Sequence, residues 1–263
     1  MLKPFCVCVY VIWLREIRKF ARERTRLFAM LGQPLLYLLI MGQGLRAIFS
    51  IDIPGFDYLS FMYPGIIGMT ILFTAMFASV SIIWDREFGV LKEVLVAPVP
   101  RSAIAVGKAL GGSTTAVIQG TILLLLAPFV GISLTLVAVL QLIPLMFLLA
   151  FAITSLGVLV AARTETMEGF HMIMNFIIMP LFMLSGAFFP IGSAPEWMQP
   201  LMKANPVAYG VDAFRNIFFA GSEVLDFIVY YPLYYDVLVL VAFSTVTVLL
   251  GMQAFRKVDR ETN

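Results

Sequence analysis

Long runs of apolar residues, separated by short polar stretches, dominate this sequence. Several of these runs reach the roughly 20 residues that a helix needs to cross about 30 Å of hydrocarbon. Stretches of strictly alternating polarity, which would indicate half-buried strands, do not occur in the pattern. We therefore expect an all-α integral membrane protein with six transmembrane helices, near residues 27–49, 61–84, 104–129, 136–161, 170–190 and 236–255.

Composition and charge support this prediction and give its orientation. Hydrophobic residues make up 61% of the 263 residues and charged residues 13%, whereas soluble domains carry about 25% charged residues. Fifteen of the eighteen Lys and Arg residues fall in the N-terminal segment, in residues 85–108 and 162–169, and in the tail, and only Arg46, Lys203 and Arg215 lie on the other side. Cytoplasmic loops are enriched in Lys and Arg, so both termini are expected in the cytoplasm. The net charge of +2 thus reflects topology and does not indicate a nucleic-acid partner.

The N-terminal segment is amphipathic on a helical wheel over residues 10–28. The apolar face contains Tyr10, Trp13, Leu14, Ile17, Phe20, Ala21, Leu27 and Phe28. The opposite face contains Arg15, Glu16, Arg18, Lys19, Arg22, Glu23 and Arg26. A basic helix of this kind is expected to lie in the membrane interface, with its rings among the acyl chains and its cations near anionic headgroups.

A charged stretch, WDREFGVLKEVLVAPVPRSAIAVGK over residues 84–108, separates the second and third predicted spans. Its charges are Asp85, Arg86, Glu87, Lys92 and Glu93, and Phe88, Leu91 and Leu95 form a helix-spaced apolar stripe beside them. Pro98 and Pro100 should end this short helix, and Arg101 follows them. A helix this short gains little from its own hydrogen bonds, so it needs a docking partner to persist. The alternative is a charged loop that only fixes topology.

Two spans carry candidate ligand-binding residues. Met69, Phe73, Met76 and Phe77 fall at helical spacing in the second span, and Asn175 and Met179 lie in the fifth. Such a stripe can serve packing alone, or it can line a cavity for varied apolar ligands, because Met is adaptable. A buried amide such as Asn175 needs either a partner on another helix or a ligand.

The segment between the fifth and sixth spans contains two short helix signals. Residues 193–196 read as a capping box that starts a helix near Glu196. Asn205 and Pro206 read as a second helix start, which Gly221 would close. These helices, over about residues 196–221, are too short to span and are expected to dip into the outer leaflet and return. Asp212 and Arg215, three residues apart, could pair there.

Several classes of protein do not fit this sequence. The predicted spans hold almost no ionisable groups, which argues against ion-coupled carriers and charged-ring channels. We find no nucleophile and base constellation and no metal cluster, so catalysis on this chain is not expected. Gly107-Lys108 is not a phosphate loop, because Ser102 and Ala109 occupy the positions where a Walker A motif needs Gly and Ser or Thr. A transport path without its own energy source implies energy from a partner.

The sequence resembles the membrane subunit of type-2 ATP-binding-cassette exporters. The resemblance rests on the amphipathic N-terminal helix, on APVPRSAIAVGK after the charged link, and on LSGAFFPIGSAPEWMQPLMKANPVAYGVDAFR. Within the last stretch, residues 206–209 (PVAY) and Arg215 match the spacing of the family's signature, with Val207 a slight departure. The order and spacing of these motifs cover essentially the full chain.

The resemblance implies a half-transporter that dimerises with a second, identical permease protomer. It also implies two copies of a separate ATPase, which binds MgATP, so that no cofactor is expected on this chain. Residues 1–26 become the connecting helix, 27–255 the six-span domain, about 85–96 the coupling helix and 256–263 the cytoplasmic tail. The ATPase contacts would be Asp85, Arg86, Glu87, Phe88, Leu91, Lys92, Glu93 and Arg101. The substrate path would involve Met69, Phe73, Phe77, Asn175 and Met179, and the external gate Pro190, Glu196, Pro206, Tyr209, Asp212 and Arg215.

The resemblance also implies the location and the cargo. Separate ATPase and permease subunits fit the cytoplasmic membrane of a bacterium or archaeon. A path rich in Met and Phe favours a hydrophobic or amphipathic small molecule or a lipid as the exported substrate. Export of a lipid-linked polysaccharide and a membrane scaffold without transport are the alternatives.

Overall fold

The computed structural model describes residues 2–23, 32–40, 44, 58–89, 100–130, 132 and 134–257. Its longer helices are α1 (Leu2–Arg22), α3 (Tyr58–Ala78), α4 (Val80–Glu87), α6 (Arg101–Leu126), α7 (Leu136–Arg163), α8 (Met167–Met183), α10 (Pro206–Phe218) and α12 (Leu233–Lys257). The shorter elements are α9 (Gln199–Lys203), α11 (Leu225–Ile228) and the 3-10 helices η1 (Ala127–Val130) and η2 (Ile191–Ser193). Within these ranges no strand occurs, which confirms the all-α prediction.

Among the described residues, four helical segments are long and apolar enough to cross a membrane, namely Tyr58–Glu87, Arg101–Phe129, Leu136–Arg163 and Leu225–Phe255. The shorter apolar helix Met167–Met183 occupies the position of the fifth predicted span. The first predicted span lies largely outside the described residues, although residues 32–40 are helical. The chain is thus an integral membrane protein, and the count of six spans stays a prediction.

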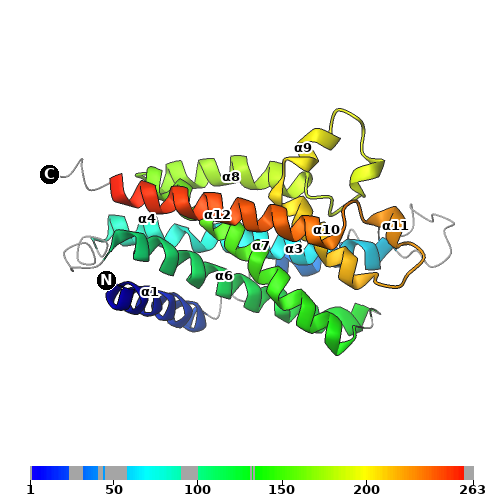
Figure 1. Cartoon of the computed structure of the whole chain (residues 1–263), viewed down its shortest axis with the longest axis horizontal. Coiled ribbons are helices and arrows are strands. Elements are labelled where there is room, and N and C mark those ends of the chain that lie inside the picture. The colour runs from blue at the N-terminus through cyan, green and yellow to red at the C-terminus, as the bar shows by residue number, and fades with distance from the viewer. Residues whose placement is uncertain are drawn as a thin grey trace.

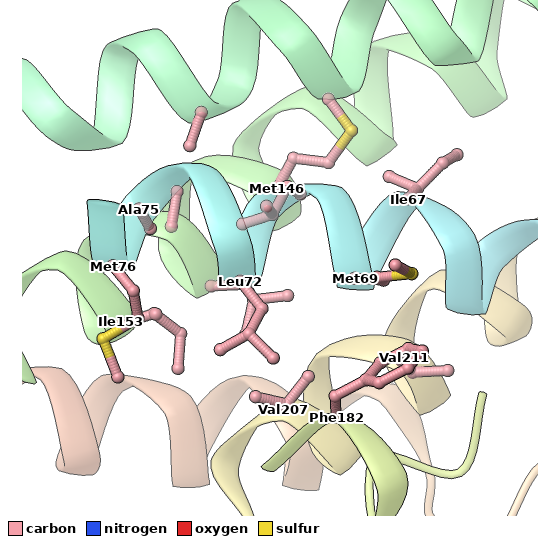
Figure 2. Close-up of a cluster of buried hydrophobic side chains, with 14 of the residues drawn as sticks. Ile67, Met69, Leu72, Ala75, Met76, Met146, Ile153, Phe182, Val207 and Val211 are labelled. Carbon is pink, nitrogen blue, oxygen red and sulfur yellow. The ribbon is translucent and has the colours of Figure 1, made fainter. Parts of the chain in front are cut away.

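Helix α3 occupies the centre of the bundle. It packs against α6, α7, α8 and α10, and Figure 2 shows Leu72, Met76 and their neighbours in contact with side chains from several of these helices. A helix that is apolar on every side is expected to be buried on every side. Met76 is fully buried in this core, so in its case the methionine stripe serves packing.

Helix α1 runs beside α6 (Figure 1) and packs one narrow stripe of its surface against the bundle. Its buried stripe is Cys8, Ile12, Glu16 and Phe20, whereas Tyr10 is 57% exposed. The assignment of Glu16 to the outer polar face is therefore wrong. The reason lies on α6, where Gly107 and Gly111 leave room for the backbone of α1: a Cβ at Gly111 would lie 2.6 Å from the Cβ of Glu16.

The segment between α8 and α12 contained two predicted helix starts, of which one does not form and the other does. The capping box at residues 193–196 does not form, because Glu196 lies in an exposed turn and α9 begins only at Gln199, without a side-chain cap. Asn205 does cap α10, since its side chain accepts a hydrogen bond of 2.9 Å from the N–H of Val207. Helix α10 ends at Phe218, and Gly221, with φ 81°, lies in the turn that follows.

Candidate functional site

A buried group of charges joins α1, α4 and α6 at one end of the bundle. The Nζ of Lys108 lies 2.6 Å from Oε1 of Glu16, 2.6 Å from Oδ2 of Asp85 and 3.0 Å from the Oγ of Ser81. The other carboxylate oxygen of Asp85 accepts a hydrogen bond of 2.6 Å from Arg15. We call these five residues the charged junction.

The charged junction is balanced in charge and largely shielded from solvent. It contains two carboxylates and two cations, and the Lys108 and Asp85 side chains are only 4% and 8% exposed. Buried charges are tolerated when they are paired and hydrogen-bonded, and removing one partner leaves a costly unpaired charge. The three helices are therefore held together at this point by interactions that do not tolerate a small displacement.

The two residues that follow Asp85 extend these connections to α7 and α8. Arg86 donates hydrogen bonds of 2.6 Å to the carbonyl of Thr164 and 3.3 Å to that of Ala162, at the C-terminal end of α7. Glu87 accepts a hydrogen bond of 3.2 Å from the N–H of Met167, the first residue of α8. A cation at a helix C-terminus and an anion at a helix N-terminus also complement the helix dipoles. Three consecutive side chains at the end of α4 thus contact α1, α6, α7 and α8.

The structure places the predicted ATPase contacts in two different environments. Asp85 and Arg86 are directed into the bundle, so they do not form the exposed docking surface that the sequence suggested. Phe88, by contrast, is 77% exposed, and Arg101 is the first residue of α6. Leu91, Lys92 and Glu93 lie outside the described residues. The sequence reasoning missed Glu16 and Lys108; the signal was a lysine beside the glycine face of an apolar helix.

A cavity of about 290 Å³ lies beside α3. Its lining consists of Gln33, Pro34, Met69, Thr70, Phe73, Thr74 and Phe77. Three of the five predicted substrate-path residues therefore meet in one cavity. Gln33, a polar residue of the first predicted span, also lines it and was not among the predicted residues. Asn175 and Met179 do not line it. Both are exposed on α8. Among the described residues, Asn175 is therefore not the buried amide that the sequence suggested.

Arg215 and Asp212 on α10 do not form the predicted pair. Arg215 is 1% exposed, donates hydrogen bonds of 2.6 Å and 3.3 Å to the carbonyls of Gly186 and Ala187, and stands 3.9 Å above the ring of Phe61. The carboxylate of Asp212 instead accepts backbone N–H bonds of 3.0 Å from Tyr230 and 2.8 Å from Tyr231. These two side chains fix the loops on either side of α10.

Burial dominates the electrostatics of α10. It raises the pKa of Asp212, an effect that the backbone donors and the charge of Arg215 oppose. It lowers the pKa of Arg215 to about 10, and the nearby carboxylate of Asp212 opposes this lowering. The charge of each group thus partly offsets the effect of burial on the pKa of the other.

The remaining predicted gate residues lie around the same helix. Pro206 is the first residue of α10, and Pro190 precedes η2. The hydroxyl of Tyr209 donates a hydrogen bond of 2.6 Å to the carbonyl of Lys203, which closes the turn between α9 and α10. Glu196 is exposed and is not brought into contact with Asp212 or Arg215.

The helical bundle, the charged junction and the buried α10 define a polytopic membrane protein whose described helices are linked at one end by buried charges. The chain belongs to the ABC-2 type transporter family, which matches residues 8–219. It is thus a membrane permease subunit of an ATP-binding-cassette exporter, as the sequence resemblance implied.

Three relatives illustrate the range of the family. The putative transport permease ycf38 of Cyanophora paradoxa is 30% identical over 217 residues, which cover 81% of this chain and 75% of the relative. The inner membrane transport permease YadH of Escherichia coli K12 is 29% identical over 235 residues, covering 85% and 88%. The probable multidrug ABC transporter permease YbhR of the same strain is 30% identical over 177 residues, covering 65% and 46%.

Proposed function

We propose that this permease moves a hydrophobic or amphipathic small molecule, or a lipid, out of the cytoplasm or the inner leaflet, driven by a separate ATPase. The observation that carries the coupling part is the set of contacts made by Asp85, Arg86 and Glu87. These residues form the start of the predicted coupling helix, about residues 85–96, and they contact four helices through charge-assisted hydrogen bonds.

This arrangement gives the ATPase a mechanical route into the bundle. A force on residues 90–99 reaches the end of α4 first, since the chain is continuous there. The charged junction then transmits it to α1 and α6, because buried ion pairs lose their stabilisation when they separate. Arg86 and Glu87 transmit it to the facing ends of α7 and α8.

The cavity beside α3 supports the substrate class. Met69, Phe73 and Phe77 supply apolar surface, while Thr70, Thr74 and Gln33 supply a few polar groups. Ligand sites are usually lined in this way and reach about 300–1,000 Å³. At about 290 Å³ the cavity is slightly smaller than this range. A second protomer would therefore be needed to complete the substrate path. Exposed apolar residues of α8, namely Met172, Ile173, Phe176, Met179 and Met183, provide a surface for that protomer or for lipid.

The wider assembly follows from the family and from the charge pattern. We infer six spans in the inner membrane of a prokaryotic cell, with both termini in the cytoplasm. The relative YadH is named an inner membrane transport permease. Two copies of the ATPase would bind MgATP, and α9 with α10 would form a re-entrant hairpin at the outer end of the path. The name of the relative YbhR supports a drug-like substrate among the options.

The test is ATP hydrolysis by the permease and its ATPase, purified together and placed in lipid vesicles. We expect a stable complex whose turnover rises with one class among lipids, amphipathic drugs and lipid-linked glycans. Glu93→Arg should abolish most of that rise, whereas Glu223→Arg, at an exposed site beyond α10, should leave it intact. Stimulation by glycans alone would overturn the substrate class. Failure of any ATPase to bind would overturn the coupling and favour a scaffold.

A further inference from the structure

Asp236 has a buried carboxyl group in the first turn of α12. Its exposed fraction is 0%. Neither carboxyl oxygen has a hydrogen-bond partner in the part of the chain that the structure describes. In Figure 1 the N-terminal end of α12, to which Asp236 belongs, lies beside α10, whereas α1 and α4 lie toward the opposite end of the bundle.

Among the described residues, the groups around Asp236 do not neutralise a negative charge. Helices α6, α7 and α10 pack against α12. Helix α7 contains no titratable side chain before Arg163 at its far end, and the cations of α6 are Arg101 and Lys108, both near its opposite end. Helix α10 contributes Tyr209, Asp212 and Arg215, and the guanidinium of Arg215 is directed to the carbonyls of residues 186 and 187. Tyr231 and Tyr235 pack around Tyr209 at ring distances of 5.3 Å and 6.2 Å.

Asp212 and Asp236 have opposite environments although both are buried. Asp212 accepts backbone N–H bonds from Tyr230 and Tyr231, which stabilise its ionised form. Among the described residues Asp236 has no such donor, and Asp212 on the neighbouring α10 places a second carboxylate close to it, which disfavours a negative charge. The N-terminal end of α12 favours an anion, but this dipole effect is small compared with the cost of burying an unpaired carboxylate.

We propose that Asp236 is a proton-binding site, and that release of its proton weakens the contact between α10 and α12. In the folded permease the carboxyl group holds the proton and is neutral. When the O–H bond breaks, the proton leaves to a water molecule and the electron pair stays on the carboxylate. The new charge then repels Asp212 across the contact of the two helices. This inference does not depend on the nature of the exported substrate.

The first test is infrared spectroscopy of the full chain in lipid vesicles during a pH titration. We expect a carbonyl stretching band of a protonated carboxylic acid at neutral pH, which disappears at alkaline pH and is missing in Asp236→Asn. Asp226→Asn, at an exposed position on α11, is the matched control and should retain the band. A band that persists in Asp236→Asn, or a wild type without the band, would overturn the proposal.

The second test measures stability against pH in the same preparation. If Asp236 holds a proton as proposed, the folded state binds one proton more than the unfolded chain, so raising the pH favours unfolding. One such proton changes the unfolding equilibrium constant by up to about tenfold per pH unit. Asp236→Asn should lose this dependence of stability on pH. Asp212→Asn should confine the dependence to a narrower pH range, because the repelling charge is gone. An Asp236→Asn variant with the pH dependence of the wild type would show that no proton links α10 to α12.

Discussion

Lys108 should be the residue on which the association of α1, α4 and α6 depends most. Its Nζ lies 2.6 Å from both Glu16 and Asp85, and its side chain is 4% exposed. Replacing it with Met keeps the length of the side chain but removes the charge. Asp85 then retains Arg15, whereas Glu16 loses the partner that holds it.

The expected cost of Lys108→Met is large. Removing one member of a buried ion pair typically lowers the free energy of unfolding by about 3–5 kcal/mol, because the other charge stays buried and unpaired. Adding Glu16→Gln should recover part of this loss, since the orphaned charge disappears. The two substitutions should therefore be non-additive by about 0.5–3 kcal/mol, as found for residues in direct contact.

The assay is equilibrium unfolding of the purified permease in mixed micelles, followed by the loss of helical signal. Lys19→Met is the matched control, because the Lys19 ammonium lies 4.7 Å from the ring of Trp84 at the surface of the same junction, a contact worth about 0.5–1 kcal/mol. A cost for Lys108→Met no larger than that of Lys19→Met, together with additive double substitutions, would refute the reasoning.

Three further outcomes follow from the packing. Gly111→Leu should displace α1 from α6, because even a Cβ there would lie 2.6 Å from the Cβ of Glu16, and protease cleavage of α1 should accelerate. Gly251→Ala should behave as wild type, because its Cβ would lie 3.8 Å from the nearest atom of Val158. Arg215→Leu should cost about 3 kcal/mol by leaving two carbonyls without donors, and thermal unfolding should show partial recovery in Arg215→Lys. Phe73→Trp should fill the cavity beside α3 and reduce substrate-stimulated ATP hydrolysis while basal hydrolysis is retained; equal stimulation in the variant would contradict a ligand role for that cavity.

Features that depend on local pattern could be predicted from the amino-acid sequence. Apolar runs indicated the all-α membrane class, because backbone groups in hydrocarbon must be satisfied within a helix. The start of α10 was also predictable, since Asn205 and Pro206 act within one turn of the helix they begin. The family resemblance rested on motif order, which is likewise a property of the sequence.

Which buried groups meet could not be predicted from the sequence, because it depends on contacts between distant helices. Lys108 lies 92 residues from Glu16 and 23 from Asp85, and no periodicity within one helix reports contacts of that kind. The face that α1 buries was set by the glycines of α6, which admit its backbone on one side. The helix start predicted near Glu196 did not form there, since a capping motif is a weak local preference that the surrounding fold can override. Asp212 and Arg215 were three residues apart and able to pair, but backbone groups from distant loops offered each of them a buried partner instead.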